Sequence, residues 1–343
     1  MYNAGNDCWL IVAIRAIQMM YYEVFEKGDP ESSYISTLFK EPDYLTDVVQ
    51  HMVRSIRMIG ADVRNKYFTK KGLLNNRHLK IAIMQDNRSV FKNSGQWDGF
   101  EGFKYLHDQM EQYTKDLEHR EILPPIDEDV LSRLFLYKGV ECSHFRTKIL
   151  LENLSSSCRD NKTVLGMKYH CKHCSHKWDE LEVWDELLLP NPRNEGTGRV
   201  GLEVLLRNKF SGLRHQQNLP CKKCKDDTGI NMREVIAVTP KNLVIQIGRS
   251  GLDLGKDNTP VDPPLEGLYF GGDIYDLSMT MHHETYEETD TGLSGHYFAY
   301  RRFQEEWVLC DDAALTTVPD GTITEKLRSD GKTISALFYY RRE

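Results

Sequence analysis

The sequence predicts an α+β fold, in which helices fill the first third of the chain and strands most of the remainder. Apolar side chains recur at helical spacing in residues 8–26, 44–59 and 100–117, and Gly28-Asp29-Pro30 interrupts the pattern after the first of these segments. From about residue 165, short apolar or alternating runs are separated by Gly, Pro and Asp, as strands are by turns; three such runs are residues 243–247, 297–300 and 337–340. Because helices and strands are segregated along the chain, alternating βαβ units are not expected.

Composition indicates a globular protein and argues against two other classes. The 343 residues are 40% hydrophobic and 28% charged, with a net charge of -7, whereas a nucleic-acid binder is expected to carry a basic face. The acidic balance leaves open whether the surface only favours solubility or meets a basic partner. The apolar run Trp9–Ile14 is far shorter than the ~20 residues of a membrane span, and the first eight residues carry Asp7 but no Lys or Arg, unlike a signal peptide. We therefore expect no membrane contact, a cytoplasmic or nuclear location, and reduced cysteines.

Two Cys-x-x-Cys pairs, Cys171/Cys174 and Cys221/Cys224, predict a metal site. Each pair lets one tight turn aim two thiolates at one ion, and two turns complete a tetrahedral, structural zinc site. Because 46 residues separate the pairs, the turns should lie on different hairpins of an extended β subdomain. Two alternatives stay open: a redox pair, which needs a βαβ context that is missing, and replacement of one thiolate by a neighbouring histidine, namely His170, His173 or His176.

Cys8 is the candidate nucleophile, because it lies at the start of the first predicted helix. A helix N-terminus presents unpaired N–H groups and a partial positive charge, which favour a reactive thiolate. Gly5 permits the tight turn that would expose such a sulfur. Taken alone, a cysteine at the head of an apolar helix is more often a buried core residue. Acyl transfer also needs oxyanion donors, which the Asn3 amide and the Cys8 backbone N–H would supply; alone, Asn3 is explained as a turn residue.

His296 is the candidate partner of this thiol. It lies in a predicted strand that a short polar stretch, residues 302–306, connects to a second strand ending near Asp311. The midpoint between positions 296 and 311 falls within that stretch, so Asp311 should face His296 across an antiparallel pair, whereas Asp312 would need a one-residue change of register. A carboxylate orients the imidazole, which then holds the cysteine as thiolate. The alternative is a hydrogen-bonded strand histidine without a catalytic role.

These motifs resemble those of the ubiquitin-specific proteases, papain-like cysteine deubiquitinases. Residues 3–8 resemble the family's cysteine box, residues 294–300 with Trp307 and Asp311-Asp312 its histidine box, and residues 95–101 its Gln-x-Asp-x-x-Glu box. The two Cys-x-x-Cys turns match its zinc-bearing fingers, residues 240–249 the strand that follows them, and residues 335–341 its closing strand. The motifs occur in the family's order across the whole chain.

The resemblance implies a single catalytic domain with a helical thumb (residues 1–135) and a β palm (136–343) whose fingers project near residues 165–235. It implies that Cys8 is the nucleophile, His296 the general base and acid, Asp311 with Asp312 the orienting carboxylates, and Asn3 the oxyanion donor. Asp98 and Glu101 would hold the arginine-containing tail of ubiquitin, and Gly295 with residues 287–293 would line a channel for its Gly-Gly end. Gln96 and Tyr297 are also expected to contact this substrate, and structural zinc is the implied cofactor.

Several residues depart from the family pattern. Asp7 stands where a Thr is usual, and a carboxylate beside the thiol would disfavour the thiolate. Trp9 replaces a Tyr, Gly102 replaces a Phe, and Cys310 replaces the Phe before the paired acids.

The resemblance implies a monomeric thiol isopeptidase acting on ubiquitin or ubiquitinated proteins. The alternatives are a catalytically weak ubiquitin-binding scaffold, a protease for another ubiquitin-like modifier and, less consistent with the net charge, a zinc-dependent nucleic-acid binder.

Overall fold

The computed structural model describes most of the chain in two compact units. One unit is formed by Met1–Asp116 with Ser278–Phe338, and the other by Leu117–Leu277 with Tyr339–Glu343. The boundaries predicted above for thumb, palm and fingers remain a prediction. The described residues are 7–20, 48–52, 77–92, 97–118, 161–195, 198–216, 219–227, 229–249, 257–289, 292–303, 305–312, 314–319 and 321–342.

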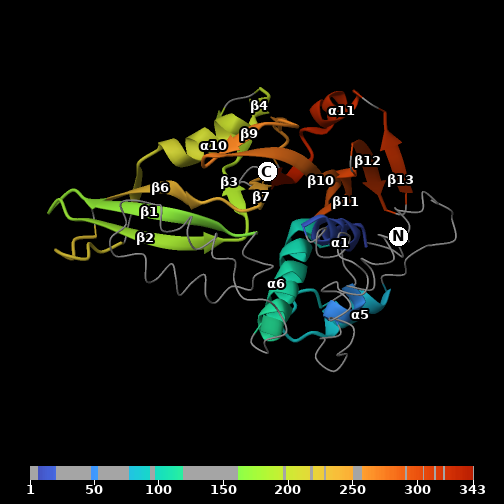
Figure 1. Ribbon diagram of the computed structural model, residues 1–343, viewed down its shortest axis with the longest axis horizontal. Coiled ribbons are helices and arrows are strands. Elements are labelled where there is room, and N and C mark those ends of the chain that lie inside the picture. Colours follow the sequence, from blue (N-terminus) through green and yellow to red (C-terminus); the bar gives the residue numbers. More distant parts are fainter. Residues whose placement is uncertain are drawn as a thin grey trace. The chain divides into compact units, whose positions relative to one another are not determined.

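The first unit opens with helix α1 (Cys8–Met20), all thirteen residues of which are buried (Figure 1). Apart from Arg15 and Gln18 its side chains are apolar, as expected of a helix that is covered on every side; one of its neighbours is a strand of the same unit, β11. The predicted start at residue 8 is confirmed, while the predicted continuation past Met20 lies outside the described residues. Residues 48–52 are helical, and two further helices follow: α5 (Arg77–Gln85) and α6 (Gly99–Glu118), the second matching the helix predicted for 100–117.

An antiparallel sheet completes the first unit. Its strand order is β13-β12-β11-β10-β14, with β10 entering from the other unit at Ser278 and β14 leaving after Phe338. The strands predicted around residues 297–300 and 337–340 are therefore confirmed. The bounds are β10 (Asp273–Thr289), β11 (Gly292–Phe303), β12 (Glu306–Asp311), β13 (Ala314–Val318) and β14 (Ile334–Arg341).

Residues 287–293 differ from the expectation of a loop. Glu288 pairs with Leu293 and Thr289 with Gly292, so β10 and β11 continue as a hairpin almost to their connection. A second difference is helix α11 (Ile323–Asp330), which lies in the region where only strands were expected. Ile323 and Leu327 are one helical turn apart, and both are buried. This two-residue apolar stripe is too short to be recognised among turn residues.

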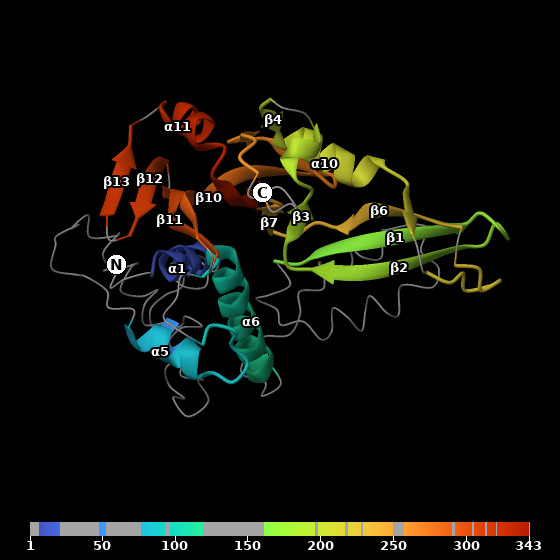
Figure 2. The ribbon, with the colours of Figure 1, turned by 180° about the vertical axis from the view of Figure 1, so that it is seen from behind.

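The second unit contains a four-stranded antiparallel sheet, β2-β1-β6-β5 (Figure 1). Here too one helix was not expected: α10 (Leu202–Ser211) interrupts the segment predicted to be β fingers. Its Leu202, Leu205 and Leu206 are buried together, and the helix contacts β6 (Figure 2). The sheet strands are β1 (Thr163–Cys171), β2 (Lys177–Trp184), β5 (Arg214–Gln216) and β6 (Ile230–Val238).

The rest of the second unit is built from short strands and a few turns. β3 (Leu187–Leu189) pairs in parallel with β7 (Asn242–Ile247), which confirms the strand predicted for 243–247. β4 (Val200–Gly201) pairs with β8 (Val261–Asp262), and β9 (Leu268–Phe270) with the first residues of β10; Pro192–Glu195 form a 3-10 turn. Within the described residues, every helix is too short or too polar to cross a membrane.

Candidate active site and metal centre

The first residue of helix α1 carries the candidate nucleophile. The Asp7 carbonyl accepts hydrogen bonds from the N–H groups of Leu10 (3.0 Å) and Ile11 (3.0 Å), so the helix begins at Cys8. Its first turn contains no acidic side chain, and Cys8 is 3% exposed. The Cys8 sulfur therefore lies at the electropositive end of a thirteen-residue helix, which stabilises a thiolate.

His296 links this sulfur to a carboxylate. Its Nε2 lies 2.6 Å from Asp311 Oδ1, and its side chain is also hydrogen-bonded to Cys8. The bond to the Cys8 thiol and the bond and charge of Asp311 outweigh burial and raise the pKa of His296 from its ordinary value of 6.5 to about 9. Cys8, His296 and Asp311 thus form a continuous relay in which the imidazole stays protonated at neutral pH.

The hairpin that brings the carboxylate to the imidazole has a different register from the predicted one. Ala299 pairs with Cys310 and Phe303 with Glu306, so Asp311 lies alongside residue 298 rather than directly opposite His296. An offset of two residues keeps both side chains on the same face of the sheet, and the contact is made diagonally. The predicted turn within residues 302–306 is confirmed.

Asp312 lies beside this relay without replacing Asp311. It follows β12 with a φ of 48°, and its charge contributes to the raised pKa of His296. A carboxylate oxygen of Asp312 lies within 4.8 Å of a ring nitrogen of His296 and of a carboxylate oxygen of Asp311. The structure therefore brings both acids to the imidazole, with the hydrogen bond going to Asp311.

The role of Asp311 can be tested through the pH dependence of kcat/KM. Because His296 is paired in its protonated form, the pairing is complete below its ordinary pKa and is lost as pH rises through about 9. The alkaline limb of kcat/KM should therefore lie near pH 9 in the parent protein. In Asp311→Asn it should move down by about 1 unit or more, since the charge and the acceptor are lost. An unmoved limb, measured on a substrate with a fluorescent leaving group, would contradict the assignment.

Asp98 caps helix α6 and is joined to the histidine strand. Its Oδ1 accepts the N–H groups of Phe100 (2.8 Å) and Glu101 (2.9 Å), and its Oδ2 accepts the hydroxyl of Tyr297 (2.8 Å). Glu101 is exposed and pairs with Lys104 at 2.7 Å. The sequence predicted Asp98 and Tyr297 as separate substrate contacts, and the bond between them was not foreseen, because 199 residues separate them.

Gly295 lies directly before His296 and has no room for a side chain. A Cβ there would stand 2.2 Å from the Glu284 carbonyl oxygen and 2.6 Å from His283 Nε2. His283 stacks on Tyr297 with ring centroids 4.2 Å apart, while His282 is fully buried between Thr280 (2.7 Å) and Thr333 (2.9 Å). Two other predicted site residues, Asn3 and Gln96, lie outside the described residues.

Trp9 and Gly102, two of the departures noted above, lie against each other. The Trp9 ring stacks on Phe91 with centroids 5.0 Å apart, and a Cβ added to Gly102 would stand 2.7 Å from Trp9 Cε3. The large residue after the nucleophile is therefore accommodated by the missing side chain on α6.

Gly102→Ala should consequently lower the free energy of unfolding by about 1–3 kcal/mol through overpacking, measured by denaturant titration. Gly198→Ala, with nothing within 4 Å of the added Cβ, is the control. Equal stability of the two variants would show that Trp9 does not need the space.

The four cysteines of the two Cys-x-x-Cys pairs form one cluster in the second unit. Their sulfurs lie within 4.8 Å of one another, with Cys171–Cys224 at 3.7 Å and Cys174–Cys221 at 3.6 Å. A tetrahedron with Zn–S bonds of about 2.3 Å has edges of roughly 3.8 Å. The donor set and its spacing therefore fit a zinc ion, and the turns lie on different hairpins as predicted.

The two turns have the same backbone geometry. The first cysteine of each donates its N–H to the carbonyl five residues on, Cys171 to His176 (2.9 Å) and Cys221 to Asp226 (2.7 Å). The residue after the second cysteine has a positive φ in both, 57° at Ser175 and 66° at Lys225. Non-glycine residues adopt this conformation rarely, so its repetition indicates a shared requirement to aim two sulfurs at one point.

The geometry favours the four cysteines over the alternative histidine ligands. Although burial opposes ionisation of Cys221, hydrogen bonds from the backbone N–H groups of Cys224 and Lys223 and from the neighbouring thiols lower its pKa to about 6. At Cys224, despite a hydrogen bond from the backbone N–H of Asp226, burial and hydrogen bonds with the other three thiols raise the pKa to about 12. His173 is 71% exposed and pairs with Asp226 (3.4 Å), and His176 stacks on Trp178. In the described residues, the clustered potential ligands at this place are the four cysteines.

Comparisons with known proteins agree with this geometry. A Schizosaccharomyces pombe protein named "Probable ubiquitin carboxyl-terminal hydrolase 4" is 25% identical over 281 residues, which are 76% of this chain; the chain spans only 46% of that protein's length. No protein-family model matches the chain.

Solved structures of the SAGA DUB module Ubp8/Sgf11/Sus1/Sgf73 match all of the chain. The form bound to monoubiquitin has a TM-score of 0.62 at 14% identity, and the form bound to ubiquitin aldehyde a TM-score of 0.60 at 15% identity; each match covers 69% of the matched chain. The chain therefore shares its fold with these solved structures and is similar in sequence to a protein named as a ubiquitin hydrolase.

Proposed function

We propose that the chain is a thiol-dependent deubiquitinase, which hydrolyses isopeptide or peptide bonds at the carboxy-terminal glycine of ubiquitin. The observation that carries the proposal is the relay Cys8–His296–Asp311, in which a sulfur at a helix N-terminus meets a protonated imidazole. This arrangement supplies a nucleophile and a proton donor. The sequence relative, named as a ubiquitin hydrolase, and the ubiquitin-bound structural neighbours support the choice of substrate.

The reaction follows the chemistry of the relay. The Cys8 thiolate attacks the glycine carbonyl carbon, and the C–N bond breaks as His296 gives its proton to the departing lysine amine. A thioester joins Cys8 to the ubiquitin glycine. His296, now neutral, takes a proton from a water molecule whose oxygen attacks the thioester, and the sulfur leaves as thiolate while His296 is again protonated. Asp311 orients the ring and stabilises its positive charge.

The developing oxyanion needs two donors in this scheme. The Cys8 backbone N–H is one, because the first N–H groups of a helix have no partner within the helix. The side-chain amide of Asn3 is proposed as the second. Asn3→Ala should therefore lower kcat and leave KM nearly unchanged, which is the signature of an interaction made only in the transition state.

Substrate selection is proposed to depend on the glycine channel and the acidic start of α6. Gly295 is proposed to line the channel for the Gly-Gly end of ubiquitin; the absence of its side chain lets its strand lie close to Glu284 and His283 just before the catalytic histidine. Glu101 is exposed and can exchange Lys104 for an arginine of the substrate. The Asp98 carboxylate is already bound by the α6 backbone and Tyr297, so we propose that it mainly positions this substrate-binding edge. Gln96 is proposed as a further substrate contact.

The zinc ion is proposed to be structural. Four thiolates from Cys171, Cys174, Cys221 and Cys224 close the tetrahedron and leave no position for a catalytic water. The ion would join the β1–β2 turn to the turn before β6 and so stabilise the end of this sheet.

A panel of modifiers tests the substrate. Ubiquitin and its relatives are each offered with a fluorescent leaving group on the terminal glycine, and kcat/KM is measured for the parent and for His296→Ala. We expect ubiquitin to be cleaved fastest and His296→Ala to be inactive. Faster cleavage of another modifier would overturn the substrate, and ubiquitin binding without cleavage would indicate a scaffold.

A further inference from the structure

A buried ion pair adjoins the candidate nucleophile. Asp7, the residue immediately before Cys8, is 3% exposed, and its Oδ1 is bound by Lys80 Nζ from helix α5. The Lys80 side chain is itself only 15% exposed. The pair joins the N-terminus of α1 to a helix some seventy residues further along the chain.

A carboxylate at this position has an electrostatic consequence for the thiol. An uncompensated negative charge next to Cys8 opposes formation of the thiolate and offsets the effect of the helix N-terminus. Burial strengthens the repulsion between the carboxylate and the thiolate, because water screens buried charges poorly. A cation bound to the carboxylate removes most of the repulsion.

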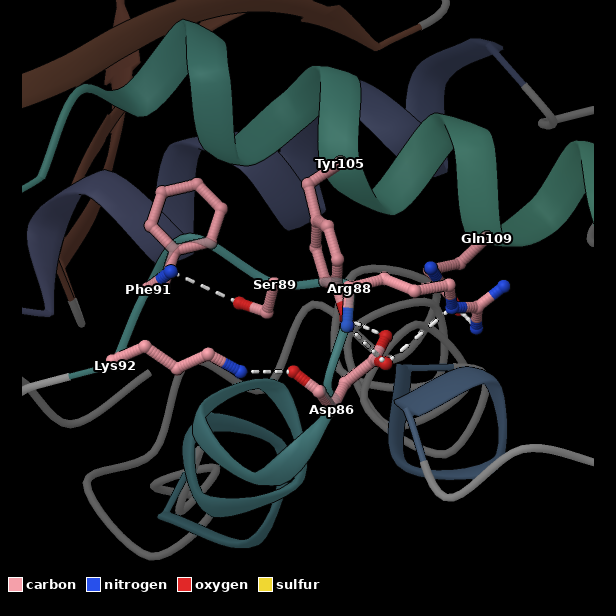
Figure 3. A network of polar contacts seen from close by, with 7 residues as sticks. All are labelled: Asp86, Arg88, Ser89, Phe91, Lys92, Tyr105 and Gln109. Atoms are coloured by element: carbon pink, nitrogen blue, oxygen red, sulfur yellow. Dashed lines mark hydrogen bonds and ion pairs between the residues drawn. The ribbon is translucent and has the colours of Figure 1, made fainter.

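The residues that directly follow the helix carrying Lys80 are bonded to α6. Asp86, which follows α5, accepts a hydrogen bond from the Tyr105 hydroxyl of α6 at 2.5 Å, and its main-chain carbonyl binds Lys92 (Figure 3). Arg88 bonds to the Asp86 carboxylate and, at 2.9 Å, to Gln109 on α6. These bonds join the end of the helix that carries Lys80 to α6.

The other charged groups around the thiol come from different elements. His296 on β11 contacts Cys8. Asp311 ends β12 and Asp312 follows it, and Asp98 at the start of α6 binds Tyr297 next to His296. The side of Cys8 facing β11 and β12 thus carries one imidazolium with two carboxylates. An unbalanced Asp7 would add a further negative charge at the residue next to Cys8.

We propose that Lys80 is a positioning residue of the thiol site, which neutralises Asp7 so that Cys8 keeps its reactive form. The inference rests on the proposed function in taking Cys8 as the nucleophile. Its test does not involve ubiquitin, however, because thiol reactivity is measured with a small alkylating reagent.

The experiment measures the rate of Cys8 alkylation by iodoacetamide against pH, with the modified peptide identified by mass spectrometry. In Lys80→Met, the midpoint of the acid limb should move up by about 1 pH unit. In the double variant Asp7→Asn/Lys80→Met, it should return to the parent value. Lys326→Met, which removes an exposed lysine of α11, should not move it.

A second variant keeps the proposal testable if Lys80→Met does not fold. Asp7→Asn retains Lys80 without its carboxylate, so the midpoint should move down, with thermal unfolding reporting folding in parallel. An unmoved midpoint in folded Lys80→Met, or in folded Asp7→Asn, would overturn the proposal and leave the pair a purely structural contact. These outcomes are distinct from failure of the proposed function, in which Cys8 alkylates as predicted but no ubiquitin derivative is cleaved.

Discussion

Cys8→Ser is expected to lower the rate of ubiquitin-ester or ubiquitin-amide hydrolysis by at least about 10⁴-fold. A serine hydroxyl at the start of α1 remains protonated near neutral pH, so the helix N-terminus and His296 have no thiolate to stabilise. The substitution changes one buried atom, and the thermal unfolding temperature should therefore stay within a few degrees of the parent. Turnover of a fluorogenic ubiquitin derivative is the measurement.

A matched cysteine variant separates the nucleophile from a general effect of thiol removal. Cys310→Ala removes another buried thiol of the same unit, whose sulfur contacts only the Val308 carbonyl at 3.9 Å among the hydrogen bonds described. This variant should retain turnover. Hydrolysis by a clean Cys8→Ser preparation at a rate near that of Cys310→Ala would refute the role of Cys8.

Cys221→Ser is expected to have the largest effect on stability. Its sulfur is fully buried, lies 3.6 Å from Cys174, and belongs to a core cluster with Cys171 and Ile230. Removing one of four thiolates should abolish stoichiometric zinc binding and cost more than about 4 kcal/mol of unfolding free energy, because metal binding in such sites is coupled to folding. Zinc content by elemental analysis and unfolding by denaturant titration are the measurements.

His173→Ala is the matched control for this prediction. His173 lies between Cys171 and Cys174 but is 71% exposed, so its loss should leave zinc content and stability unchanged. If His173→Ala lost the ion while Cys221→Ser kept it, the ligand set would include the histidine and the four-thiolate site would be wrong.

The sequence was most informative where spacing alone determines geometry. The spacing of the two Cys-x-x-Cys pairs predicted that their four sulfurs meet at one point, as they do. The start of α1 at Cys8 could likewise be predicted from the apolar pattern. The register predicted for the β11–β12 hairpin was wrong by two residues, because the register depends on which residues form the turn. The same-face relation of His296 and Asp311 survived this error, since the period of a strand is two.

Contacts between distant segments could not be predicted. Lys80 has no sequence signal that links it to Asp7, and the bond of Tyr297 to Asp98 joins a strand to a helix cap. Helix α10 was missed because its buried leucines form a short stripe among strands. Two departures from the family pattern, Asp7 and Trp9, each find a compensating residue in the structure, Lys80 and Gly102 respectively.

The central claim is that the Cys8 sulfur, paired with His296, attacks the terminal carbonyl of ubiquitin. Incubation of the intact protein with ubiquitin carrying a carboxy-terminal electrophile, followed by peptide mapping, tests it most directly. The account predicts a covalent adduct of one ubiquitin at Cys8, formed by the parent and absent in Cys8→Ser. An unlabelled parent protein, or an adduct mapped to any other cysteine, would contradict it.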